Sequence, residues 1–251
     1  MSLLPELLDT VFAGIGEFEA QREIAGGRKW RASLLGSCLR RQYIELVEKR
    51  PYPPVDARTQ RIFQVGHLTG ELIGKALKSA GILLEEELAL DDEEWDIGAH
   101  VDFLIGGPVQ NGDGDPFSQA IRERVRQMFS DPLPVIGVEL KSKSSKSFWW
   151  AKKKNEPVAG ENQLIQAATY DVLARKKNLH VDRWVVLSVS KDDLSMAEDY
   201  VTEEHRRKVM RRLMLLNNAT EARDLPCDCL ITWNGKGWMY CPYGVSEREC
   251  C

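Results

Sequence analysis

Two residues of opposite charge occupy one strand pattern in the sequence. Glu139 follows the apolar residues VIGV at 135–138, and Lys141 lies two positions further on. Because side chains alternate along a β-strand, Glu139 and Lys141 project from the same face, and Leu140 projects from the other. One interpretation is a surface ion pair on an edge strand, which contributes ~0–1 kcal/mol. The other is that Glu139 binds a divalent cation while Lys141 stabilises developing negative charge or positions a water.

A second carboxylate interrupts an earlier strand pattern. Asp102 lies in AHVDFLI, where apolar residues otherwise indicate a buried strand. Two strand carboxylates and a lysine are a typical donor set for a hard divalent cation, which prefers oxygen ligands. The sequence therefore predicts a site at Asp102 and Glu139, with Lys141 beside it and the carbonyl of Leu140 as a further metal ligand.

Cations and aromatic residues alternate immediately after this strand, in KSKSSKSFWWAKKK. Lysines can follow a phosphate chain, and aromatic faces can stack on unpaired bases. The segment thus predicts a single-strand binding groove or a wedge at a duplex end. The alternative is a solvated loop whose tryptophans pack into the core. The candidate nucleic-acid contacts are Lys143, Lys146, Trp149 and Trp150.

The six cysteines are unevenly distributed, with Cys38 alone and five in the last 25 residues. The N-terminal residues read as an amphipathic helix with apolar positions between 4 and 15, and not as a signal peptide. We therefore expect a cytoplasmic protein, in which clustered thiols indicate metal binding more often than disulfides. Inert thiols are the alternative.

Bulk composition limits the class of protein. The chain has 251 residues, 43% hydrophobic and 29% charged, with a formal net charge of −4. These values are typical of one soluble globular domain, and no run approaches the ~18 apolar residues of a membrane span. The net charge excludes a uniformly basic nucleic-acid coat but permits local basic patches.

The elements that must position these residues follow from periodicity. Helices are expected in residues 1–50, where Ser33 is a candidate N-cap, and at 58–80, where Gly81 follows as a natural stop. The remaining expected elements are strands at 82–90 and 96–105, a strand around Glu139, a helix at 160–177, a strand at 183–190 and a helix at 201–218.

This order, α, β, β, β, α, β, α, predicts an α/β mixed sheet flanked by helices. The first two strands are joined by a turn short enough for antiparallel pairing, and the helix after the third strand permits a crossover to the fourth. We expect one domain with a helical part (1–80), a catalytic sheet core (81–200) containing an insertion (107–134), and a C-terminal helix and cysteine-rich tail (201–251).

The ordered set of motifs resembles a known nuclease family. Asp102, the Glu139-x-Lys141 motif and the pair Gln166 and Tyr170 resemble the D, ExK and QxxxY series of the RecB-like branch of the PD-(D/E)XK nuclease superfamily. The i and i+4 spacing of Gln166 and Tyr170 places both on one helical face. The resemblance implies the PD-(D/E)XK fold and phosphodiester hydrolysis with Mg²⁺ or Mn²⁺, with all five residues in the catalytic site.

The cysteines resemble those of the iron–sulfur nucleases of that branch, which include CRISPR-adaptation exonucleases, phage relatives and AddB. There, one upstream and three downstream thiolates hold a [4Fe–4S] cluster, and four thiolates are the usual complement. The resemblance implies this cofactor at Cys38, Cys229, Cys241 and Cys250. Cys227 and Cys251 are alternatives at two of these positions, and zinc is the alternative metal.

The sequence departs from the family pattern in the helix before the sheet. The family often has Gly-x-x-x-His followed by Glu, whereas Gly70 stands here where that histidine would fall, directly before Glu71. The resemblance implies Glu71 as a further metal ligand. His67 lies one turn earlier and is the alternative ligand, and it has a further reading as a capping or surface histidine.

Together these features predict a metal-dependent DNA exonuclease. We expect it to act on single-stranded DNA or duplex ends in recombination, repair, phage replication or CRISPR adaptation, in the cytoplasm or, for a phage protein, the host cytoplasm. No membrane partner is expected, and the oligomeric state is open. The alternative is a noncatalytic nucleic-acid-binding module with a structural zinc site.

Overall fold

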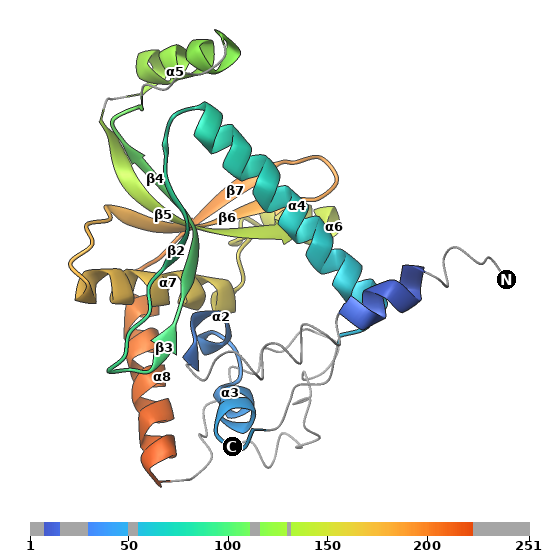
Figure 1. The fold of residues 1–251 in the computed structure, drawn as a ribbon, viewed down its shortest axis with the longest axis vertical. Coiled ribbons are helices and arrows are strands. Elements are labelled where there is room, and N and C mark those ends of the chain that lie inside the picture. The colour runs from blue at the N-terminus through green and yellow to red at the C-terminus, as the bar shows by residue number, and fades with distance from the viewer. Residues whose placement is uncertain (1–7, 16–29, 50–54, 111–115, 130–131, 223–251) are drawn as a thin grey trace, which may run out of the picture.

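A five-stranded mixed sheet forms the centre of the computed structural model (Figure 1). The structure describes residues 8–15, 30–49, 55–110, 116–129 and 132–222. The strands in spatial order are β2 (Leu83–Ala89), β4 (His100–Gly107), β5 (Leu133–Lys143), β6 (Arg183–Ser190) and β7 (Met196–Tyr200). A second, two-stranded sheet pairs β1 (Trp30–Arg31) with β3 (Ile97–Gly98).

The predicted strand pairings are confirmed. β2 and β4, joined by a short connection, are antiparallel, as are β4 and β5. β5 and β6 are parallel, because two helices cross over between them, and β7 adds an antiparallel edge strand. The expectation of a mixed sheet flanked by helices is therefore correct.

Seven helices with defined bounds accompany the sheets in the described residues, and residues 8–15 form a further short helix within the predicted N-terminal one. They are α2 (Ala32–Leu35), α3 (Leu39–Leu46), α4 (Ala57–Ser79), α5 (Pro116–Met128), α6 (Ser145–Lys154), α7 (Glu161–Lys176) and α8 (Glu203–Ala222), numbered so that the helix at 8–15 comes first.

The helix α4 covers one face of the sheet with an apolar contact. Ile73 of α4 packs with Phe103, Val138 and Val185 from three neighbouring strands. Three glycines spaced four residues apart let the helix lie close: a Cβ added at Gly70 would be 3.8 Å from a Leu140 methyl carbon, and the positions 66 and 74 are closer still to the sheet. This face is therefore the one that receives the side chains of Val138 and Leu140.

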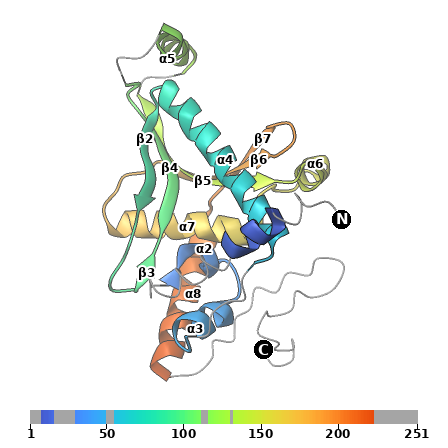
Figure 2. The same ribbon diagram turned by 45° about the vertical axis from the view of Figure 1, so that its right-hand side comes forward.

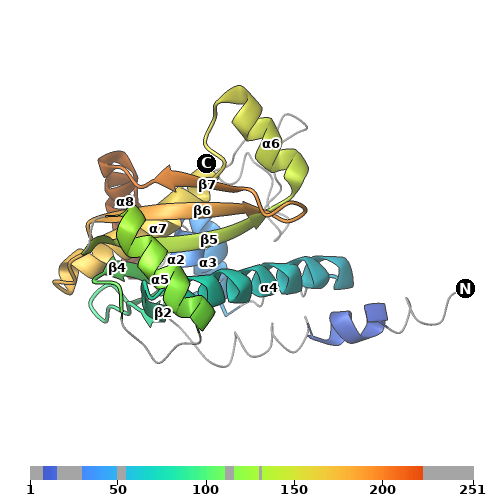
Figure 3. The same ribbon diagram turned by 90° about the horizontal axis from the view of Figure 1, so that it is seen from above.

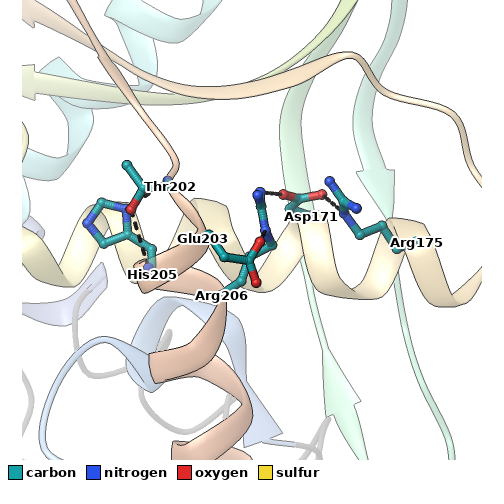
Figure 4. Close-up of polar contacts among 6 residues, drawn as sticks. All are labelled: Asp171, Arg175, Thr202, Glu203, His205 and Arg206. Carbon is teal, nitrogen blue, oxygen red and sulfur yellow. Dashed lines mark hydrogen bonds and ion pairs between the residues drawn. The ribbon is translucent and has the colours of Figure 1, made fainter.

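The other face is covered by α7, which packs with α2 and α8 in a second core (Figure 2). Asp171 of α7 is buried and forms ion pairs with Arg175 at 2.7 Å and with Arg206 of α8 at 2.5 Å (Figure 4). Arg206 also bonds Glu203 at 2.8 Å in the first turn of α8. This network fixes α8 against α7, and so fixes the helix that carries Gln166 and Tyr170.

Three sequence-based expectations need correction. Ser33 is not an N-cap, because it lies within α2, whose N-cap is Arg31, and a break at 36–37 separates α2 from α3. The segment from Ser145 is a helix, α6, because Ser144 accepts a hydrogen bond from the Ser147 amide as its N-cap. The strand β7 was not anticipated, since its alternating, half-exposed residues MAEDY carry a weak apolar signal.

Candidate metal and nucleic-acid site

The structure brings Asp102 and Glu139 together on neighbouring strands. Phe103 of β4 pairs with Val138 of β5, so the next residues, Asp102 and Glu139, lie directly opposite each other. Both project from the face covered by α7, since Glu139 accepts a hydrogen bond from the Tyr170 hydroxyl at 2.8 Å. Like charges directly opposite on adjacent strands are destabilising. The local sequence thus creates a costly contact that a bound cation would relieve.

Each carboxylate has a distinct set of partners. Asp102 accepts a hydrogen bond from the Leu140 amide at 2.5 Å. Glu139 is 1% exposed and forms an ion pair with Lys141, which lies two residues further on the same face. The predicted convergence of Asp102, Glu139 and Lys141 is therefore present in the structure.

Gln166 and Tyr170 join the same cluster from α7. The Gln166 side-chain amide donates to the Tyr170 hydroxyl at 2.7 Å, and that hydroxyl donates to Glu139. The family resemblance placed both residues in the catalytic site. In the structure, Tyr170 binds the Glu139 carboxylate directly, and Gln166 acts on it only by orienting the Tyr170 hydroxyl.

The electrostatics of the pair follow from burial. Desolvation, and then the Glu139 charge, raise the pKa of Asp102 from 3.8 to about 7, although the Leu140 amide opposes the shift. Burial also raises the pKa of Glu139, against the stabilising effects of Lys141 and Tyr170. Burial and the Glu139 charge raise the pKa of Tyr170 well above 10, so the hydroxyl stays a hydrogen-bond donor.

Sequence reasoning missed one carboxylate near the pair. Glu86 pairs with Phe103 and Leu88 with Val101, so Glu87 lies opposite Asp102 on the outer strand β2. Its charge contributes to the raised pKa values of both Asp102 and Glu139. The signal was present as the run EEE at 85–87, but its backbone has φ of 54° at Glu87, so simple strand alternation did not single it out.

A second missed residue is Ser188 of β6. Its register partner on the adjacent parallel strand is Lys141. The Ser188 side chain is 0% exposed, and its hydroxyl oxygen has no hydrogen-bond partner among the described residues. A buried hydroxyl without a partner is costly, which is a recognised mark of functional positions.

The structure does not bring Glu71 or His67 into this cluster. Both are exposed on α4. The glycines directly before them, Gly66 and Gly70, face the side of the sheet that carries Leu140, which is opposite the face of Glu139. Within the described ranges, no three His, Cys, Asp or Glu side chains come together as a metal-binding group. Asp102 and Glu139 are thus the two converging carboxylates.

The aromatic and cationic segment lies on α6, beyond the end of β5 (Figure 3). Trp149 and Trp150 are 49% and 54% exposed, whereas Phe148 is 1% exposed and occupies a small core. Lys154 lies over the Trp150 ring at 3.8 Å from its centroid. The alternative in which the tryptophans pack into the core is therefore wrong, and the exposed basic surface includes Lys146.

Cys38 is the N-cap residue of α3 and is half-buried. The preceding residues are tied to α8, because the buried Arg212 guanidinium donates to the carbonyls of Leu35 and Ser37. The other proposed cluster ligands, Cys229, Cys241 and Cys250, lie outside the described residues, together with Cys227 and Cys251.

No protein-family description matches the sequence, and no curated protein does. A structural match covers 99% of this chain and 98% of a solved chain described as the crystal structure of SSO0001, with 12% sequence identity and a TM-score of 0.49. No helix among the described residues is long and apolar enough to cross a membrane. The chemistry of the site therefore rests on its own residues.

Proposed function

We propose that this protein is a divalent-metal-dependent deoxyribonuclease with a PD-(D/E)XK fold, acting on DNA ends or single strands. The observation that carries the proposal is the pairing of Asp102 with Glu139, directly opposite each other, with Lys141 on the same face. A binding module has no need to place two carboxylates where phosphate must approach, because they repel it.

The residues present fit Mg²⁺ or Mn²⁺. Asp102 and Glu139 supply carboxylate oxygens as ligands. The pKa values of both groups are raised because both are buried, and the nearby positive charge of Lys141 does not fully offset that burial. Mg²⁺ in phosphate chemistry typically binds one or two carboxylates, substrate phosphates and several waters. A cation held there would supply Lewis-acid activation of the phosphate and of a water.

The protein's own residues then have separable tasks. Tyr170 holds one oxygen of Glu139 and so fixes the direction of the other, and Gln166 fixes Tyr170. Lys141 forms an ion pair with Glu139. A cation bound by Glu139 would take up part of the carboxylate charge and leave the Lys141 ammonium to offset negative charge on the reacting phosphate.

Exposed Trp149 and Trp150, with the lysines of α6, support a strand-binding role. Base stacking on an aromatic side chain is worth ~1–3 kcal/mol per base and tolerates any sequence. The residues of this surface follow β5 directly in the sequence, so a DNA strand that leaves the site at this end of β5 reaches α6 next.

The deciding experiment is a cleavage assay on end-labelled single- and double-stranded DNA with Mg²⁺, Mn²⁺ or EDTA. Asp102→Ala, Glu139→Ala and Lys141→Ala should each abolish metal-dependent cleavage, and Glu93→Ala, an exposed carboxylate in a turn, should not. Labelling either end in turn distinguishes stepwise digestion from internal cuts. Full activity in any two of the three site variants would refute the assignment.

A [4Fe–4S] cluster at Cys38 is part of this proposal. Its support is a contact between α8, which leads into the cysteine-rich tail, and the residues just before Cys38. Arg212 of α8 donates hydrogen bonds to the carbonyls of Leu35 and Ser37. Iron, sulfide and visible absorbance in anaerobically purified protein should all be present in the natural sequence and fall in Cys38→Ser. Stoichiometric zinc without iron or sulfide would instead indicate a zinc site.

A further inference from the structure

Lys143 is a fixed cation on the same sheet face as the proposed catalytic residues. Glu139, Lys141 and Lys143 alternate along β5, so all three project toward α7. The Lys143 ammonium donates to the Gln163 side-chain oxygen at 2.6 Å. That oxygen also accepts from the amide of Gly160, the N-cap residue of α7, at 2.9 Å. The lysine is therefore held at a defined position by a helix that is itself packed on the sheet.

Lys143 has no counter-charge of its own within the described residues. Lys141 is paired with Glu139, whereas the partner of Lys143 is a neutral amide. The nearest favourable charge is that of Asp199, whose carboxylate is already bound by the Ala159 amide at 2.7 Å. Burial, and then the neighbouring Lys141, lower the pKa of Lys143. A half-buried ammonium beside another cation is costly unless an anion neutralises it.

We propose that Lys143 binds the phosphate adjacent to the one being cleaved, on the side of the strand that leads to α6. This inference rests on the proposed nuclease function. Residues two apart on a strand are ~6.6 Å apart, comparable to the separation of consecutive phosphates on a nucleic-acid chain. If Lys141 faces the scissile phosphate, Lys143 faces the next one. The following bases then reach α6, which lies beyond the end of β5 (Figure 3) and carries Trp149 and Trp150.

The substrate is thereby a polynucleotide with an intact phosphate on one defined side of the cleaved bond. A charge-assisted hydrogen bond to phosphate is roughly twice as strong as a neutral one. Loss of this contact should weaken productive binding about tenfold to hundredfold. The effect should appear mainly in KM, because the contact forms with bound substrate and does not involve the reacting atoms.

The test combines a protein change with a single neutral linkage in the DNA. Oligonucleotides carry one methylphosphonate either before or after a fixed scissile bond. In the natural protein, one of the two positions should reduce kcat/KM about tenfold or more. Lys143→Met should reduce cleavage of ordinary DNA by a similar factor and show no further loss on that methylphosphonate substrate, and Lys143→Arg should retain the discrimination.

Two further variants separate binding from folding. Lys75→Met removes an exposed lysine of α4, which covers the other face of the sheet, and should keep the full methylphosphonate penalty. Gln163→Leu leaves the charge but removes the acceptor that positions it, so it should raise KM and reduce the penalty. Equal penalties in the natural protein and folded Lys143→Met would overturn the inference. Absence of cleavage by the natural protein on any DNA would instead overturn the nuclease proposal itself.

Discussion

Replacing Asp102 with Asn should stabilise the metal-free protein while abolishing cleavage. The Asp102 carboxylate lies opposite Glu139, and burial and that charge raise its pKa from 3.8 to about 7. An asparagine has nearly the same shape and can still accept the Leu140 amide hydrogen bond. It removes a buried charge that has no adequate compensation in the absence of a cation.

The expected gain follows from the size of the shift. About three pKa units, at ~1.4 kcal/mol per unit, correspond to ~4 kcal/mol of unfavourable interaction in the fully ionised site. Any interaction of the replacement amide with Lys141 is lost or weakened relative to the carboxylate, so the gain should fall between ~1 and 4 kcal/mol at pH 8. Urea unfolding in EDTA, followed by tryptophan fluorescence, measures it directly.

The sign of the pH dependence is fixed by the direction of the shift. The folded-state pKa of Asp102 is above its ordinary value of 3.8, so the folded protein holds a proton that the unfolded chain has released. The natural protein therefore loses stability relative to Asp102→Asn as pH rises from about 4 to about 7, and the difference is constant above that. The advantage of the variant should grow between pH 5 and 7 and level off by pH 8.

Asp193 provides a control of opposite sign. Hydrogen bonds from Ser190 and the Ser195 amide lower the pKa of Asp193 to about 2, so its contribution is favourable above pH 4 and is lost as pH falls through about 2. Asp193→Asn should reduce stability with no trend between pH 5 and 8. If Asp102→Asn destabilises the EDTA-treated protein, or its advantage does not change with pH, the charge conflict deduced for the pair is absent.

Two further predictions concern residues around the pair. The double change Trp149→Ala and Trp150→Ala should weaken single-strand binding in a fluorescence anisotropy titration by ~1–3 kcal/mol per stacked base. The unfolding midpoint should fall only slightly, because both side chains are about half exposed and the Trp149 ring nitrogen donates a hydrogen bond to Asp193 at the surface. Unchanged affinity would refute the stacking role. Ser188→Ala should keep or raise the melting temperature, because it removes a buried hydroxyl without a partner, yet lower kcat and shift its pH profile. A stability loss with unchanged kinetics would mark Ser188 as structural.

The sheet could be predicted from sequence because its strands carry strong apolar patterns. β4, β5 and β6 lie where alternating or continuous apolar runs place them, and the connection lengths gave their directions. The helix α6 could not be predicted, since serine and lysine runs carry no apolar period, and its capping by Ser144 depends on local backbone geometry. β7 depends on pairing with β6, a tertiary contact that local pattern does not contain.

The site was predictable to the extent that it lies on strands. Alternation alone places Glu139 and Lys141 on one face, and register then brings Asp102 opposite. Register itself is not visible in sequence, so Glu87 and Ser188, which join the site only through pairing across strands, were missed.

The two faces of β5 have different roles, since one packs in the core and the other carries the proposed catalytic residues. Val138 and Leu140 pack beneath α4, whose glycines allow close approach and whose apolar contacts stabilise the sheet. The opposite face holds Glu139 and Lys141 in a polar cluster that costs stability. Consecutive residues of β5 project from opposite faces. A shift of register by one residue would therefore move the apolar side chains to the α7 face and the charged ones to the α4 face. The apolar face therefore fixes the register that aligns the carboxylates, so a cavity made beneath α4 by Val138→Ala should impair cleavage through the alignment of Glu139 as well as through stability.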